Sequence, residues 1–488
     1  MNSGFRSQCV PSYRLLTEEQ IKELHLATLE VLETVGVRVM CDEGVELLRS
    51  AGCRVRDGNI VQIPPWLVEE CIRSAPPRIT IYNRKGEEAM LLEGRKIYFG
   101  MGTDLTMTYD LYTGELRPSV LQDVRNMARV ADACEHIDFL ASMALPHDVP
   151  TNAMYVECVK AQIENSTKPI FFTAGGREDL EYIIRMAEVV AGGPEALRAR
   201  PFIIHYSEPT PPLTHSYGAV RKLFLCAERG IPICYPPGLI LGASGPVTLA
   251  GGIVQANAEA LSGVVLHQLR AKGAPIISGI AAVPMDMSTS TFCYGAPEFR
   301  LTNSAFADLY HWYGLPMWST VGTDAHAFDQ QAAIEHAIAI FMAALDGANL
   351  IHDVGYLGQG LIGNPAMVLM GNELISYTKR LLRGFDITRD TLALDVIRRV
   401  GPGGHYLAEE HTLRHFRQEL WRPQFLNRDD PDTWISKGRK TYADRVIQET
   451  KRLLETHRPE PLPADTAAAI EAIAAEARQA LAGIHFIA

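Results

Sequence analysis

The chain has 488 residues, of which 47% are hydrophobic and 21% charged, a composition typical of a soluble globular protein. Its formal net charge of −11 at pH 7, without a basic run interleaved with aromatic residues, argues against a nucleic-acid-binding protein. The 9 cysteines include no C-x-x-C pair and the N-terminus lacks an apolar signal segment. We therefore expect free thiols and a cytoplasmic location.

Residues 1–120 alternate too irregularly for repeated strand–helix units. Thr17 and Gln20 form a capping box for a first helix, and Gly36 is suited to end it. This region is therefore predicted to be a mixed N-terminal cap. Its further elements are predicted as helices at 43–50 and 64–74 and strands at 78–83 and 96–109.

From residue 121 to 404, short apolar runs alternate with helical patterns, which indicates parallel strands with crossover helices. Eight such units fit a closed (β/α)8 barrel, although an open doubly wound sheet would give the same local pattern. Residues 405–488 are predicted to be a helical extension packed on this domain. The strands are predicted at 139–143, 169–174, 201–206, 231–235, 275–280, 316–320 and 350–354, with a less marked eighth at 366–370.

The segment from Gly230 to Ala258 contains no charged residue. Prolines and small residues interrupt it, so it does not read as a membrane span. It predicts a strand, a glycine-rich loop and a helix with Pro246 near its first turn. Unpaired backbone N–H groups at the start of that helix, at Gly245 and Val247, are a candidate site for a carboxylate.

Four segments of the chain resemble the trimethylamine methyltransferase family. They are YDLYTGELRPSVLQDV (109–124), SGPVTLAGGIVQANAEALSG (244–263), STSTFCYGAPE (288–298) and TDAHAFDQQAAIEH (323–336). The resemblance implies an α/β protein with a (β/α)8 barrel, and so favours the barrel over the open sheet. It also implies transfer of a methyl group from a methylated amine to the cobalt of a separate corrinoid protein.

The trimethylamine branch of this family carries pyrrolysine, whereas this chain has only standard residues. It therefore resembles the branch that demethylates quaternary amines such as glycine betaine. Loss of a methyl from neutral trimethylamine would expel an amide anion, whereas a quaternary amine leaves as a neutral tertiary amine. We expect glycine betaine to be converted to dimethylglycine, with proline betaine, carnitine and γ-butyrobetaine as alternatives.

The expected reaction needs no acid, nucleophile, metal or tightly bound cofactor from this chain, because the partner's Co(I) is the nucleophile. In such a barrel the site lies at the carboxyl ends of the strands. Aromatic rings there would attract a trimethylammonium group by roughly 0.5–2 kcal/mol each, although any one such ring is more often a core or wall residue. The candidate substrate-binding rings are Tyr98, Phe99, Phe171, Phe172, Tyr206, Tyr235, Trp318 and Tyr356.

His352, near the end of the seventh predicted strand, is a candidate for binding the substrate carboxylate. Because adjacent strand residues point to opposite faces, at most one of His352 and Asp353 is expected to face the barrel interior. A buried histidine satisfied by the backbone is the alternative for His352.

Two other functions stay open. Asp324, His326 and Asp329 could serve as ligands in a metal-dependent hydrolase or lyase, although the chain has no H-E-x-x-H motif. The aromatic residues would also suit a non-catalytic betaine-binding protein. We expect a homo-oligomer, with neither nucleic acid nor a membrane as a partner.

Overall fold

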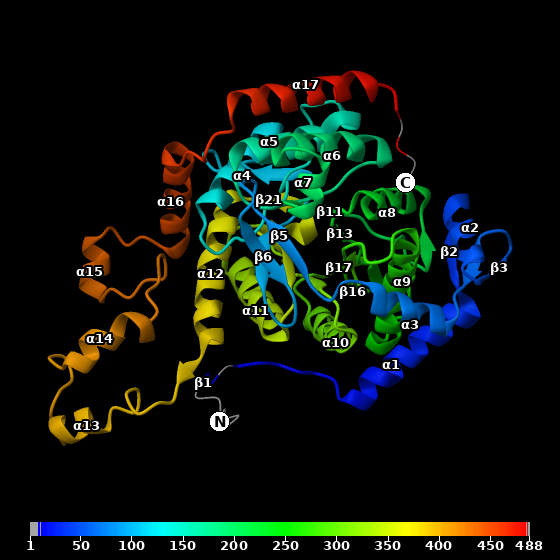
Figure 1. The fold of residues 1–488 in the computed structure, drawn as a ribbon. Coiled ribbons are helices and arrows are strands. Elements are labelled where there is room, and N and C mark those ends of the chain that lie inside the picture. The colour runs from blue at the N-terminus through cyan, green and yellow to red at the C-terminus, as the bar shows by residue number, and fades with distance from the viewer. Residues whose placement is uncertain (1–7, 10, 485, 487–488) are drawn as a thin grey trace.

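The computed structural model describes residues 8–9, 11–484 and 486. Their centre is a barrel of parallel strands surrounded by helices (Figure 1). Seven of its strands form one hydrogen-bonded series in the order β10–β11–β13–β15–β18–β19–β7. Their bounds are β7 (Tyr98–Met101), β10 (Ile170–Phe172), β11 (Ile203–Tyr206), β13 (Ile233–Cys234), β15 (Ile276–Gly279), β18 (Met317–Thr320) and β19 (Leu350–Val354).

Phe139 and Leu140 close the barrel between β7 and β10. Phe139 forms a parallel bridge with Gly100, and Leu140 forms one with Ile170. The backbone N–H of Leu140 donates to Pro169 at 2.8 Å. Only glycine fits at position 100, because a Cβ there would lie 2.2 Å from carbons of the Phe139 ring. The predicted (β/α)8 barrel is therefore confirmed, with this short segment as one of its strands.

One predicted barrel strand is wrong, and a strand predicted in the N-terminal cap belongs to the barrel. Residues 366–370 begin α12 (Pro365–Arg383), where Asn364 caps the helix by accepting from the N–H of Ala366. Periodicity cannot distinguish a short buried apolar run in a helix from a buried strand. The remaining barrel strand is β7, within the segment assigned to the cap, so the barrel begins before residue 121.

A crossover helix follows each barrel strand. α9 is long and apolar enough, by length and composition alone, to cross a membrane, but 72% of its most apolar window is buried inside the structure, as in a core helix. The crossover helices are α4 (Leu121–Ala133), α5 (Met154–Asn165), α6 (Arg177–Ala191), α8 (Tyr217–Arg229), α9 (Leu249–Arg270), α10 (Pro297–Tyr313), α11 (Gln330–Asp346) and α12, with the short α7 (Pro194–Ala199) after α6.

The N-terminal cap packs against the outside of α9 through α1 and α3. The capping box of Thr17 and Gln20 is confirmed at the start of α1, and Gly36 ends the first helical segment with a φ of 82°. The cap comprises α1 (Glu18–Glu30), β2 (Val37–Val39), α2 (Asp42–Ser50), β3 (Arg54–Arg56), β4 (Ile60–Gln62), α3 (Pro65–Ser74), β5 (Ile79–Tyr82) and β6 (Glu88–Leu92).

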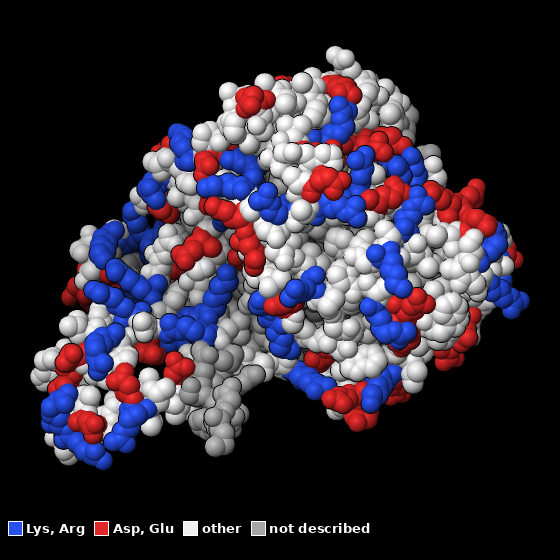
Figure 2. All heavy atoms as spheres, viewed as in Figure 1, with Lys and Arg blue, Asp and Glu red and all other residues white. Residues whose placement is uncertain are grey.

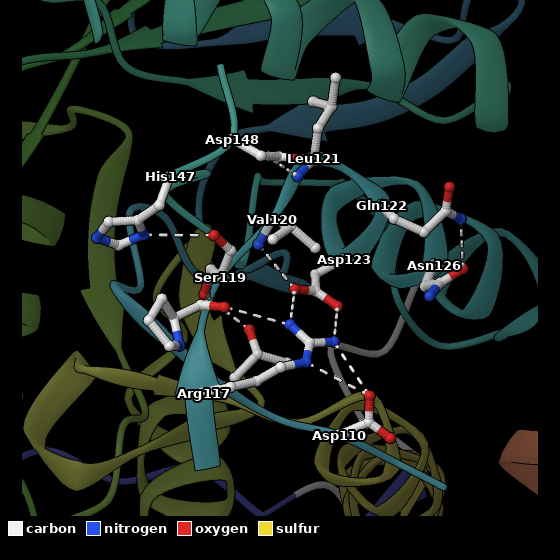
Figure 3. A network of polar contacts seen from close by, with 12 residues as sticks. Asp110, Arg117, Ser119, Val120, Leu121, Gln122, Asp123, Asn126, His147 and Asp148 are labelled. Carbon is white, nitrogen blue, oxygen red and sulfur yellow. Dashed lines mark hydrogen bonds and ion pairs between the residues drawn. The ribbon is translucent and has the colours of Figure 1, made fainter. Parts of the chain in front are cut away.

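The segment between β7 and α4 forms a separate hairpin before the chain enters its first crossover helix. Figure 3 shows that Arg117 joins Asp123, in the first turn of α4, to Asp110, with nitrogen–oxygen distances of 2.7 and 3.2 Å. The Asp123 carboxylate also accepts from the N–H of Val120 at 2.9 Å. These contacts fix the hairpin against the first turn of α4. The hairpin strands are β8 (Met107–Tyr109) and β9 (Leu116–Pro118).

Two small sheets rise from the carboxyl ends of the barrel strands. One continues β13 and β15 and consists of β14 (Gly238–Leu241), β16 (Ala281–Asp286) and β17 (Thr291–Phe292). The other joins the β8–β9 hairpin to β20 (Tyr356–Leu357) and β21 (Ile362–Gly363). Both sheets supply residues beyond the strand ends, where the site is expected.

The C-terminal helices divide into two parts. α16 (Tyr442–Thr456) packs on α4 and α12, and α17 (Ala464–Ala480) packs on α5 and α6. Residues 385–436, here called the arm, extend away from the barrel at the lower left of Figure 1. The arm contains β22 (Phe385–Asp386), α13 (Leu394–Val400), α14 (Glu410–Glu419) and α15 (Pro431–Ser436).

We expect Phe139→Ala to lower the free energy of unfolding by about 3–5 kcal/mol, because it removes a fully buried ring. That ring packs on Phe171 with a centroid distance of 5.7 Å at the barrel closure. Thermal and chemical denaturation would measure the effect. Phe416→Ala is the matched control, since its ring lies 38% exposed on the arm. Equal losses in the two variants would contradict the importance of this closure.

Candidate active site

A cavity of about 240 Å³ lies at the carboxyl ends of the barrel strands. Its aromatic lining comes from both the strands and the segments that follow them, and apart from tyrosines its ionisable side chains are two carboxylates and one histidine. A larger surface hollow of about 990 Å³ is formed only by residues 424–455 and is open to solvent. The functional lining of the barrel cavity comprises Tyr206, Glu208, Phe292, Tyr294, Trp318, His352, Asp353 and Tyr356.

Four predicted site residues line this cavity together: Tyr206, Trp318, His352 and Tyr356. The Tyr206 ring centroid lies 6.0 Å from that of Trp318 and 5.8 Å from that of His352. Phe171 packs against His352 at 4.6 Å without lining the cavity. The end of the barrel is therefore a continuous aromatic cluster.

The other predicted rings do not line the cavity. Phe172 packs against His205 at 5.1 Å, and Tyr235 stacks on His215 at 5.9 Å. Both follow a strand residue that points inward, so the alternation of the strand directs them to the surrounding helices. Tyr98 accepts a hydrogen bond from the N–H of Leu91, and Phe99 is fully buried.

The expected helix N-terminus also lies elsewhere. α9 begins at Leu249 with Thr248 as its N-cap, because the residues after β13 form β14 and a turn. The N–H of Gly245 donates to Ile240 at 3.1 Å, and Val247 is 62% exposed. Neither residue lines the cavity, so the structure gives no support to a carboxylate site there.

His352 and Asp353 both line the cavity, so the expectation that at most one faces inward is wrong. Asp353 has a φ of 74°, and the pairing of β19 with β7 shifts register between Ile351 and Val354. This irregularity interrupts the alternation of the strand. The Nδ1 of His352 lies 2.8 Å from an Asp353 carboxylate oxygen, while Thr320 donates a hydrogen bond to the other oxygen. Such left-handed non-glycine backbone is concentrated at functional sites.

Glu208 was not among the predicted site residues. It lies in the loop after β11, where the hydroxyl of Tyr206 donates to its carboxylate at 3.2 Å. Desolvation raises the pKa of Glu208 to about 7, with the Asp104 charge adding to this, while the Tyr206 hydrogen bond and the Lys222 charge oppose it. Water still reaches the side chain through the cavity opening. Its position two residues beyond a strand-ending tyrosine could have identified it.

Buried polar atoms in the cavity lack partners. The indole Nε1 of Trp318 and the Nε2 of His352 have no hydrogen-bond partner among the residues that the structure describes. Buried donors without partners are rare in proteins and indicate places where a ligand or water binds. Of the described lining residues, none is a lysine or arginine.

The three candidate metal ligands have separate places in the structure. Asp324 accepts from the N–H groups of Tyr294 and Gly295 at 2.6 and 2.9 Å, and thereby orients the Tyr294 loop. His326 is exposed, and Asp329 caps α11. In the described part of the chain they do not form a metal-ligating cluster. Tyr294 and Phe292, which sequence reasoning also missed, come from the segment 288–298 that carries the family resemblance.

Comparison with known proteins identifies the family of the chain. The family model described as trimethylamine methyltransferase (MTTB) matches residues 3–482. The chain is 34% identical over 465 residues to trimethylamine methyltransferase MttB of Desulfitobacterium hafniense strain DSM 10664 / DCB-2, covering 94% of this chain and 93% of that protein. It is 29% identical over 472 residues to glycine betaine methyltransferase of D. hafniense strain Y51, covering 96% and 98%.

A solved structure supports the fold. The crystal structure of monomethylamine methyltransferase (MtmB) from Methanosarcina barkeri superposes with a TM-score of 0.53 at 10% identity, covering 91% of this chain and 88% of that one. At that identity the likeness concerns the fold alone. The family match and the relatives covering nearly the whole chain show that the protein belongs to the trimethylamine methyltransferase family and is a methyltransferase.

Proposed function

We propose that the protein transfers a methyl group from a quaternary amine, glycine betaine first, to the Co(I) of a corrinoid carried by a separate protein. The observation that carries this proposal is that the barrel cavity offers one set of groups suited to a cation and another suited to an anion. Aromatic rings and the Glu208 carboxylate suit a cation, whereas two unpartnered donors suit a carboxylate. Glycine betaine carries both charges on one small molecule.

The ammonium end fits the aromatic lining. Tyr206, Tyr294 and Tyr356 present rings to the cavity, and Glu208 supplies the opposite charge. A trimethylammonium group has no N–H to donate, so ring faces and a nearby carboxylate are the available means of attraction. In this proposal Glu208 is a substrate-binding residue.

The carboxylate end fits Trp318 and His352. Their unpartnered Nε1 and Nε2 atoms belong to rings whose centroids lie 5.9 Å apart, close enough to serve one carboxylate. An oxygen of the neighbouring Asp353 carboxylate lies 2.8 Å from the Nδ1 of the same ring. An imidazole that carries a proton on Nε2 donates from that atom, which keeps the predicted function of His352 and adds Trp318 to it.

The proposed reaction requires few chemical groups from this chain. The Co(I) nucleophile attacks one N-methyl carbon, the C–N bond breaks, and its electron pair remains on nitrogen as the neutral tertiary amine. The lining residues orient that methyl group and exclude water. The enclosure must be incomplete on the side of the transferred methyl, which agrees with a cavity that opens at the strand ends.

The other functions remain as outcomes of tests. A metal-dependent reaction has less support, because Asp324, His326 and Asp329 do not cluster among the described residues. A binding protein without catalysis would use the same lining. The homo-oligomer and the cytoplasmic location stay predictions, and so do proline betaine, carnitine and γ-butyrobetaine as alternative substrates.

We expect glycine betaine and a Co(I) corrinoid protein to give dimethylglycine and methylated corrinoid, while trimethylamine gives no product. The reason is that only the quaternary amine has a neutral leaving group. Mass spectrometry of the amine and the visible spectrum of the corrinoid would follow both products. Comparable turnover of trimethylamine would contradict the proposal. Betaine binding without product would favour a binding protein, and loss of activity with a chelator would favour a metal enzyme.

We expect Trp318→Phe and His352→Ala each to weaken glycine betaine binding by about ten- to a hundredfold, because each removes a charge-assisted hydrogen bond worth roughly 1.5–3 kcal/mol. Choline, which has a hydroxyl in place of the carboxylate, should lose much less. Calorimetric titration of both ligands would measure the difference. Trp312→Phe is the matched control, since Trp312 is 43% exposed on α10. Equal losses for both ligands would mean that the two residues only support the fold.

We expect choline to bind about two- to fivefold more tightly at pH 8 than at pH 6, because Glu208, with a pKa of about 7, is neutral at the lower pH. Water at the cavity opening screens the charge, so the effect is smaller than the tenfold of a full one-unit shift. Choline isolates this end of the cavity because it has no carboxylate for His352. Glu208→Gln should abolish the pH dependence. If the pH dependence persists in this variant, it arises from another group, such as Asp104.

A further inference from the structure

The arm contains a cluster of potential metal ligands that has no place in the proposed reaction. His411 and His415 lie one helical turn apart on α14 and so project from the same face. Asp390 reaches them from the segment between β22 and α13. One ligand atom from each of the three side chains lies within 4.8 Å of the other two.

The geometry of the cluster resembles metal coordination more than hydrogen bonding. The Nε2 of His415 lies 3.0 Å from the Oδ2 of Asp390. This Nε2 is nevertheless shielded from solvent without a hydrogen bond of acceptable angle among the described residues. With bonds of about 2.0–2.1 Å, the ligands of a tetrahedral zinc ion lie about 3.3 Å from one another. A separation of 3.0 Å without a hydrogen bond is compatible with both atoms binding one metal ion.

We propose that Asp390, His411 and His415 bind a divalent transition-metal ion, Zn²⁺ first. Two imidazoles and one carboxylate suit zinc, nickel, cobalt or copper, whereas calcium and magnesium prefer all-oxygen sites. Three protein ligands leave a fourth position for water. The site is independent of the proposed methyl transfer, because none of its residues lines the barrel cavity.

The charges around the cluster leave an oxygen of Asp390 available. Arg414 approaches Oδ1 at 3.5 Å, whereas Oδ2 faces His415. An adjoining hollow of about 480 Å³ carries both signs of charge, from arginines such as Arg389 and Arg399 and acids such as Asp395 and Glu410. Figure 2 shows basic and acidic side chains interspersed on the visible face of the arm. No excess of positive charge therefore opposes a cation.

Such a metal would fix the shape of the arm. The segment before α13 is joined to α14 by the Arg414 contact and by His411, whose Nε2 lies 3.3 Å from the Asp390 backbone oxygen. Exposed contacts of this kind contribute little. A metal ion would replace them with coordinate bonds between two segments about 20 residues apart in the sequence, which closes a loop and reduces its freedom.

The test uses the full chain, dialysed against a chelator and titrated with ZnCl₂ by calorimetry. We expect the wild type to bind one zinc ion whose affinity falls by more than about tenfold in His411→Ala and His415→Ala. His405→Ala is the matched control, since it removes an exposed arm histidine outside the cluster. Any zinc bound outside the cluster would be common to all four proteins, so the difference between variants is what tests the site.

Hydrogen exchange supplies a second measurement. Zinc should slow exchange of residues 387–419 in the wild type and in His405→Ala, but not in the two cluster variants. Unchanged circular dichroism and betaine binding would show that the variants fold. The proposal is overturned if all four proteins bind zinc with equal affinity, if the wild type binds none, or if zinc leaves exchange in the arm unchanged.

Discussion

The alternation of side chains along parallel strands decides what this cavity contains. A barrel strand directs every second residue inward, so of two adjacent aromatic residues only one reaches the interior. Phe171 packs on His352 while Phe172 packs outside on His205. The arrangement requires a closed barrel, which depends on the two residues Phe139 and Leu140. At Asp353, where the pairing of β19 with β7 shifts register, the alternation is interrupted and both His352 and Asp353 line the cavity.

The cavity also illustrates a balance between binding and catalysis. In the proposed reaction the substrate nitrogen is positive before transfer and neutral afterwards, so any group that stabilises the cation stabilises the starting state most. A permanently charged, fully buried carboxylate would therefore oppose the reaction. Glu208 lies instead at the opening, where its pKa of about 7 makes its charge adjustable.

Much of the fold followed from the sequence because it rests on local patterns. The apolar runs at 169–174, 201–206 and 350–354 each contain a barrel strand, and the Thr17 capping box begins α1. The exceptions have physical reasons. The strand β7 is separated from its partner β19 by some 250 residues, and no local pattern encodes such a pairing.

The site was predictable only in part. Strand ends identified Tyr206, Trp318, His352 and Tyr356, but a pattern of aromatic residues does not give the direction of each ring. Glu208 and Tyr294 lie in loops, and their positions depend on contacts made across the barrel. For Tyr294 that contact is the Asp324 carboxylate, which sequence reasoning had considered only as a metal ligand.

The pairing of β7 with β19 has a consequence for synthesis of the chain. The first barrel strand leaves the ribosome long before the last one, and its partner on that side does not yet exist. At roughly 5–20 residues per second, this edge stays unpaired for about 13–50 s. Unpaired strand edges promote association between chains. The growing chain is therefore expected to depend on chaperones that shield this edge until Leu350–Val354 is made.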